Sequence, residues 1–94
     1  MAGEHDIRAV EVRVRGLVQG VGYRFGALHR AAALDVAGWI RNENNGDVLA
    51  HLEGLGYRID SLLEWMREGS PSAQVTRVDV SSAAVEGWDG FTLR

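Results

Sequence analysis

The residues best suited to chemistry lie in one glycine-rich stretch, residues 16–24, which contains three glycines within its first seven positions. Glycine tolerates positive φ, so such a loop can turn several backbone N–H groups toward one point. The helical pattern that follows adds unpaired N–H groups and the positive end of a helix dipole. Arg24 adds a permanent cation whose forked donors fit oxyanions. The stretch therefore predicts a cradle for a phosphate-sized anion.

The same loop has a second interpretation. A glycine-rich turn between a strand and a helix is often only a tight connection, and an arginine in a first helical turn is often solvated. The spacing is neither the dinucleotide-binding fingerprint nor the P-loop, which requires Lys followed by Ser or Thr after its last glycine. The loop taken alone leaves anion binding and a plain structural turn as equal alternatives.

Length and composition restrict the class of protein. The 94 residues, 46% of them hydrophobic, suffice for one domain with one core. The absence of cysteine excludes disulfides, thiolate metal sites and cysteine nucleophiles. A net charge of −3 argues against a general nucleic-acid binder, because such proteins use a surplus of Lys and Arg. No apolar run reaches the ~20 residues of a membrane span, and the N-terminus lacks a secretory signal. We expect a soluble cytoplasmic protein without membrane or nucleic-acid partners.

Hydrophobic periodicity predicts the elements that position the loop. Residues 1–6 are small and polar and should form a flexible tail, which leaves residues 7–94 as the domain. Strict alternation from Ile7 predicts a strand with one face toward a core. A helix should follow the loop as far as Leu34. Its expected apolar face consists of Val21, Phe25, Leu28 and Ala32.

The second half of the chain predicts two strands, a helix and two further strands. Residues 36–42 and a strand from Val48 should form an antiparallel hairpin around Asn45-Gly46. A stripe at i, i+3, i+4 and i+7 predicts a helix that ends at residues 69–72. A strand around residues 76–81 and a short strand at 91–93 complete the chain. The order β-α-β-β-α-β predicts an α+β, ferredoxin-like sandwich, with an antiparallel sheet, both helices on one face and a short extra C-terminal strand.

Asn42 is the polar residue at the end of the second strand. An asparagine side chain cannot act as a general base, but it can hold a water molecule by accepting a hydrogen bond from it. Asn42 also begins a stretch typical of a hairpin tip, and taken alone that turn role is the better interpretation.

Two segments taken together resemble the signature segments of the acylphosphatase family. The first is residues 16–24, and the second is Gly38-Trp39-Ile40-Arg41-Asn42 followed by Gly46. The resemblance runs from about residue 7 to the C-terminus. It implies hydrolysis of the carboxyl–phosphate bond of small acyl phosphates to a carboxylate and inorganic phosphate, without metal or cofactor.

The resemblance also implies roles for individual residues. Arg24 matches the family's phosphate-binding arginine, and Asn42 matches the asparagine that orients the attacking water. The expected phosphate-binding loop consists of Leu17, Val18, Gln19, Gly20, Val21, Gly22 and Tyr23. Leu17 departs from the family pattern, where arginine is frequent, and so does Glu43, where threonine or an apolar residue is common. The charge of Glu43 could weaken substrate binding or shift its pH dependence.

Other interpretations are less well supported. His5, His29 and His51 show no ligand spacing, so no metal site is expected. RNA-recognition domains share this order of elements, but their aromatic-rich strand motif is missing. A non-catalytic phosphate-binding regulatory module of the same fold is the alternative to an enzyme. Nothing in the sequence requires more than a monomer.

Overall fold

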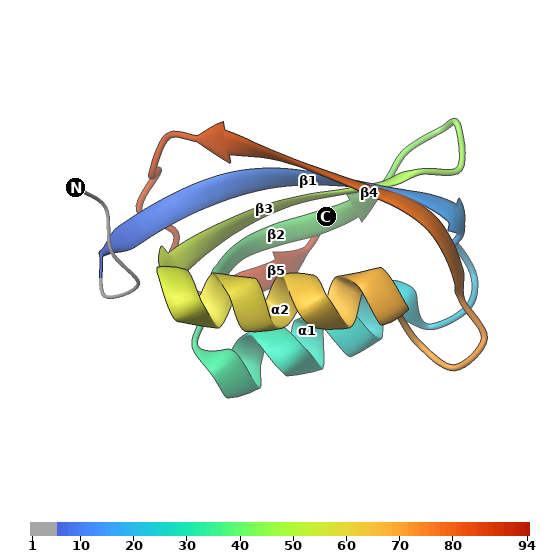
Figure 1. Ribbon diagram of the computed structural model, residues 1–94, viewed down its shortest axis with the longest axis horizontal. Coiled ribbons are helices and arrows are strands. Elements are labelled where there is room, and N and C mark those ends of the chain that lie inside the picture. Colours follow the sequence, from blue (N-terminus) through green and yellow to red (C-terminus); the bar gives the residue numbers. More distant parts are fainter. Residues whose placement is uncertain (1–5) are drawn as a thin grey trace.

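The computed structural model describes residues 6–94 and confirms the expected order of helices and strands (Figure 1). The predicted tail, apart from Asp6, lies outside the described residues, and so does His5. The elements are β1 (Ile7–Leu17), α1 (Tyr23–Leu34), β2 (Ala37–Asn42), β3 (Val48–Leu55), α2 (Gly56–Glu68), β4 (Gln74–Ala83) and β5 (Phe91–Leu93). Within residues 6–94 no helix is long and apolar enough to cross a bilayer.

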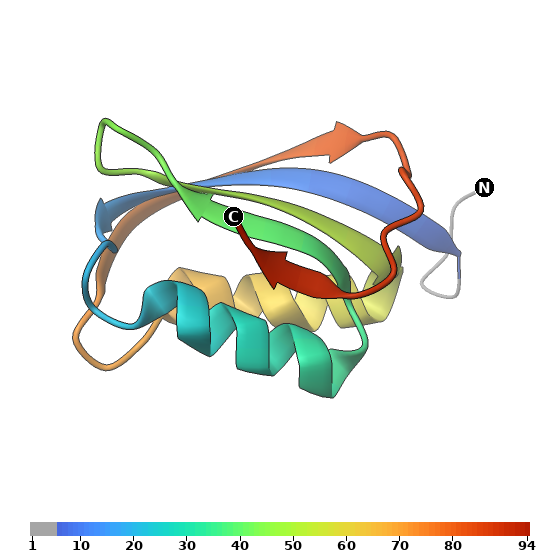
Figure 2. The same ribbon diagram turned by 180° about the vertical axis from the view of Figure 1, so that it is seen from behind.

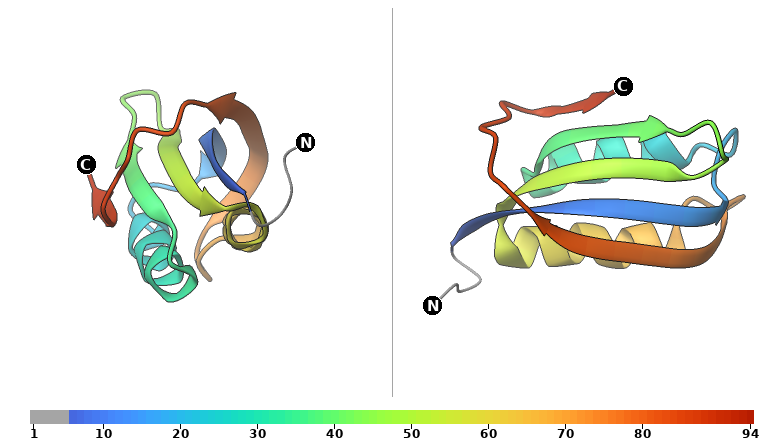
Figure 3. Two further views of the ribbon diagram at one scale, coloured as in Figure 1. Left: turned by 90° about the vertical axis from the view of Figure 1, so that its left-hand side faces the viewer. Right: turned by 90° about the horizontal axis from the view of Figure 1, so that it is seen from above.

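The five strands form one sheet in the order β4-β1-β3-β2-β5, with both helices on the same face (Figures 2 and 3). Strand pairs β1–β3, β1–β4 and β2–β3 are antiparallel, as predicted. The prediction of an antiparallel sheet is incomplete, because β5 pairs with β2 in parallel. The connection through residues 84–90 crosses the end of the sheet, so β5 returns along the opposite edge in the direction of β2 (Figure 3).

The core lies between the sheet and the helices. Val12 and Val14 of β1 are fully buried, as the alternating pattern predicts. The apolar stripe of α2 is buried too, and it consists of Ile59, Leu62, Leu63 and Met66.

The predicted apolar face of α1 is wrong. The helix begins at Tyr23 and buries Tyr23, Ala27 and Ala31, while the Phe25 side chain is 60% exposed. Small residues on this face allow α1 to approach α2 closely. A Cβ atom at Gly26 would lie 2.5 Å from the Trp65 indole ring. Close packing between the helices, more than hydrophobicity alone, therefore selects the buried face.

Candidate active site

The loop between β1 and α1 exposes its backbone to one hollow. Gly20 and Gly22 adopt φ angles of 74° and 78°, a left-handed conformation that glycine takes without strain. Gly22 is the N-cap of α1, and no side chain caps the helix there. The N–H groups of residues 18–22 donate no hydrogen bond to any acceptor among residues 6–94. The loop therefore offers open donors at a helix N-terminus, the arrangement that binds phosphate in many proteins.

A pocket of about 230 Å³ lies against this loop. It is lined by Val18, Gly20, Gly22, Tyr23, Arg24, Phe25 and Asn42. The structure thus brings Arg24 and Asn42, from α1 and the end of β2, to one hollow. The volume is below the ~300–1,000 Å³ of sites for drug-sized ligands and suits a small anion. Leu17, Gln19 and Val21, which were expected in the loop site, do not line the pocket.

The Arg24 guanidinium has no ion-pair or hydrogen-bond partner among the described residues. Several other arginines of the chain do have acidic partners, as Arg8 has with Asp60 and Arg58 with Asp35. An uncompensated cation beside open N–H groups and a helix N-terminus makes the pocket electropositive. The pocket is therefore suited to bind an oxyanion.

Asn42 is the last residue of β2 and lies opposite Val48 across the hairpin. Its side chain is exposed at the pocket and has no hydrogen-bond partner within the described part of the chain. Its carboxamide is therefore available to a ligand or a water molecule. Because no side-chain bond to residues 6–94 holds this group, its location follows the backbone of the hairpin.

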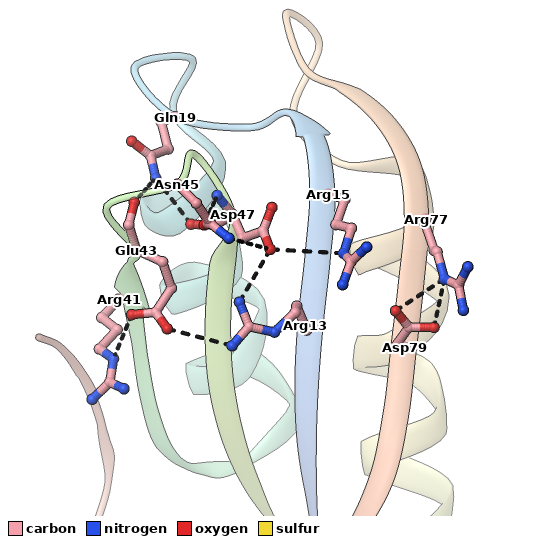
Figure 4. A network of polar contacts seen from close by, with 9 residues as sticks. All are labelled: Arg13, Arg15, Gln19, Arg41, Glu43, Asn45, Asp47, Arg77 and Asp79. Carbon is pink, nitrogen blue, oxygen red and sulfur yellow. Dashed lines mark hydrogen bonds and ion pairs between the residues drawn. The ribbon is translucent and has the colours of Figure 1, made fainter.

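Two side chains, one within the loop and one from the turn after α2, hold the loop in place. The Gln19 side-chain nitrogen donates to the backbone oxygens of Glu43, at 2.8 Å, and Asp47, at 2.9 Å (Figure 4). On the other side of the loop, the Ser70 hydroxyl donates to the Val21 carbonyl at 2.8 Å. Sequence reasoning missed both contacts, and it treated Ser70 only as part of a helix stop. The local sequence around Gln19 or Ser70 does not indicate a hydrogen-bond partner so far away along the chain.

The two departures from the family pattern lie outside the pocket. Leu17 ends β1 and is 55% exposed. The Glu43 carboxylate is bound by the guanidinium groups of Arg41, at 3.1 Å, and Arg13, at 3.5 Å (Figure 4). These two cations reduce the field that Glu43 exerts on a bound anion.

Tyr23 lines the pocket but is not suited to acid–base chemistry. Its ring is buried against Trp65, with 5.5 Å between the ring centroids, and its hydroxyl donates to the Met66 carbonyl at 2.8 Å. Burial raises the pKa of Tyr23, so the side chain stays neutral. We therefore assign it a structural role in the packing of α1 against α2.

A second polar cluster lies toward the other end of β3. Its members, His51, Glu53 and Glu86, have ligand atoms within 4.8 Å of one another, a convergence that their spacing in the sequence did not predict. The buried Glu53 carboxylate accepts the backbone N–H groups of Glu86, Gly87 and Trp88, and the His51 ring nitrogen lies 2.7 Å from it. Burial opposes ionisation, but these hydrogen bonds outweigh it and lower the pKa of Glu53. Glu53 thus anchors the connection that leads to β5.

The sequence and the fold both match known proteins. A sequence model of the family described as Acylphosphatase matches residues 10–93. An acylphosphatase of Synechococcus sp. (strain RCC307) is 48% identical over 82 residues, which cover 87% of this chain and 70% of that protein. An acylphosphatase structure from Coxiella burnetii aligns with a TM-score of 0.91 and 35% identity, covering 95% of this chain and 94% of that one. An acylphosphatase structure from Bacillus subtilis aligns with a TM-score of 0.89 and 32% identity, covering 95% of this chain and 99% of that one. With agreement of this kind over nearly the whole domain, the chain belongs to the acylphosphatase family.

Proposed function

We propose that this protein is an acylphosphatase that hydrolyses the carboxyl–phosphate bond of small acyl phosphates to a carboxylate and inorganic phosphate. One observation carries the proposal: a single pocket joins a guanidinium, loop N–H groups and a carboxamide that have no partner within the described part of the chain. The first two bind the phosphate, and the third acts on water. This combination distinguishes a hydrolytic site from a simple anion-binding loop.

The phosphoryl group is bound by the loop and by Arg24. Backbone N–H groups of the lining residues Val18, Gly20 and Gly22, together with the guanidinium, donate to its peripheral oxygens. Phosphoryl transfer depends mainly on positioning and on stabilising charge in the transition state. Loss of one preorganised donor of this kind typically costs about 3–4 kcal/mol of transition-state stabilisation.

The attacking water is held by Asn42. Its carboxamide oxygen accepts a hydrogen bond from the water and holds the water oxygen in line with the bond to the departing carboxylate. A carboxylate is a good leaving group, so the protein need not protonate it. Among the described residues, those that line the pocket include no histidine and no carboxylate. We therefore propose that an oxygen of the substrate's own phosphate takes the proton of the water.

The acyl group lies toward Phe25. This side chain is the exposed apolar group of the lining, whereas Val18 and Tyr23 are buried. An aromatic ring at the mouth of the pocket favours apolar acyl groups by contact with their carbon atoms.

The proposal also covers the cofactor requirement, the oligomeric state and the location of the enzyme. Within residues 6–94 the lining lacks the His, Asp and Glu side chains that usually bind catalytic metals, so we propose a reaction without metal or cofactor. We further propose a cytoplasmic monomer with residues 7–94 as its domain.

Turnover of benzoyl phosphate in excess chelator tests the proposal. We expect hydrolysis by the unmodified protein and a loss of about 10²–10³-fold in kcat for Asn42→Ala, because the water loses its orientation. Asn44→Ala is the matched control, since Asn44 lies exposed in the same hairpin outside the pocket lining. Phosphate binding without any turnover would instead favour the non-catalytic regulatory module.

A further inference from the structure

The position of Asn42 depends on a contact that reaches across from the glycine loop. The Asn42 carboxamide has no partner of its own among residues 6–94, so it follows the backbone of the β2–β3 hairpin. That hairpin closes through a hydrogen bond from the Glu43 N–H to the Asp47 carbonyl at 2.8 Å. Glu43 directly follows Asn42, so any displacement of the closing bond displaces the carboxamide.

Gln19 binds both residues that form the closing bond, Glu43 and Asp47, through their carbonyl oxygens. The two hydrogens of its carboxamide nitrogen are directed to the carbonyl oxygens of Glu43 and Asp47, at 2.8 and 2.9 Å. Figure 4 shows the Gln19 side chain reaching from the loop to the hairpin. Gln19 does not line the pocket, although its neighbours Val18 and Gly20 do. One partly buried side chain therefore connects the phosphate cradle to the strand end that carries Asn42.

The surrounding contacts make this connection rigid. The Arg13 guanidinium binds the Asp47 carboxylate at 3.0 Å and the Glu43 carboxylate at 3.5 Å, so the hairpin is also held to β1 (Figure 4). The loop is held on its other side by the bond from Ser70 to the Val21 carbonyl. Each half of the site is thus anchored separately. Among the described residues, the hydrogen bonds of Gln19 are the polar contacts that join the two halves directly.

We infer that Gln19 is a positioning residue that sets the distance between the phosphate cradle and Asn42. The inference rests on the proposed function, and it assigns Gln19 a role different from contact with phosphate. In-line attack requires the water and the phosphorus atom to be aligned, and a misplacement of about 1 Å can cost roughly 10²-fold in rate. Gln19 therefore acts on kcat through Asn42, while Arg24 and the loop N–H groups still bind phosphate.

Gln19→Leu tests the inference because leucine is of similar size but cannot donate to the hairpin. With benzoyl phosphate as substrate, kcat should fall by about 10- to 100-fold. The inhibition constant of inorganic phosphate should change by less than about threefold, because the phosphate donors remain. Gln74→Leu is the matched control: Gln74 is exposed opposite Leu17, close to the loop, and its side chain makes no hydrogen bond in the described structure.

Gln19→Glu supplies a pH readout that a general loss of structure would not reproduce. An ionised carboxylate would face two carbonyl oxygens and repel them, whereas the protonated acid can donate one hydrogen bond. Part of the lost kcat should therefore return as the pH falls through the pKa of the introduced carboxyl group, which these carbonyl oxygens raise. The unmodified protein and Gln74→Leu should show no such increase in kcat as the pH falls.

Amide hydrogen exchange separates failure of this inference from failure of the proposed function. In Gln19→Leu the N–H groups of Glu43 and Gly46 should exchange faster, while that of Ile40 in β2 should not change. If the unmodified protein turns over and Gln19→Leu retains its kcat, the positioning role is wrong and the proposed function stands. Equal losses of kcat and phosphate affinity would also overturn it, because Gln19 would then support the cradle itself. A protein without turnover refutes the proposed function, and the exchange rates still show whether Gln19 holds the hairpin.

Discussion

Arg24→Ala should leave the fold at least as stable as before while removing almost all turnover. The Arg24 side chain has no acidic partner among the described residues, so its removal breaks no ion pair. It lies in the first turn of α1, where a cation faces the positive end of the helix dipole at a cost of about 0.3–1 kcal/mol. Alanine is also a better helix former. The free energy of unfolding should therefore rise by about 0.3–1 kcal/mol, which for a domain of this size is about 1–6 °C in Tm.

The effect on catalysis should have the opposite sign and be larger. Arg24 supplies forked donors to the phosphoryl oxygens, and loss of one such donor costs about 3–4 kcal/mol in the transition state. That corresponds to about 10²–10³-fold in kcat/KM, at 1.36 kcal/mol for each factor of ten. Arg24→Lys keeps the charge but loses the fork, so it should recover little of the lost activity.

Thermal unfolding with and without inorganic phosphate, together with benzoyl phosphate turnover, measures both effects. Phosphate at 100 times its Kd should stabilise the unmodified protein by about 2.7 kcal/mol and should stabilise Arg24→Ala much less. Arg30→Ala is the control, because Arg30 is an exposed residue of the same helix that does not line the pocket. A loss of more than about 2 kcal/mol of stability in Arg24→Ala would assign Arg24 a structural role. Turnover or phosphate stabilisation at the unmodified level would refute its role in binding.

Two further predictions concern Glu53 and Phe25. The pKa of Glu53 is lowered from its ordinary value of 4.5, so its stabilisation is complete above that value and is lost as the pH falls through the folded-state pKa. Glu53→Gln should therefore lower the free energy of unfolding by about 1–3 kcal/mol near pH 7 and weaken its decrease at acid pH. Urea unfolding from pH 3 to 8 measures both effects, and an unchanged decrease at acid pH would contradict the anchoring role. Phe25→Ala should lower kcat/KM for benzoyl phosphate about fivefold more than for acetyl phosphate, since the ring contacts only the larger acyl group. Equal losses for both substrates would place the acyl group elsewhere.

The local patterns of the sequence determined most of the fold. Alternation in β1, the hairpin turn at residues 43–47 and the apolar stripe of α2 each depend on neighbours in the chain, so the sequence pattern predicts them directly. The two motifs also pointed to Arg24 and Asn42, and both residues line one pocket. Their roles in the reaction remain predictions that the variants above test.

The sequence by itself thus determined the elements, their order and the residue types of the site. Only the tertiary structure decided which face of α1 is buried, that β5 runs parallel to β2, and that Gln19 joins the loop to the hairpin. These features arise from contacts between segments far apart in the chain, and their energies depend on distance and packing in space. Periodicity along the sequence records which residues prefer burial, but it does not record which partner each residue meets. The geometry between the phosphate cradle and Asn42 is likewise decided by the tertiary structure, because two separate segments of the chain form it.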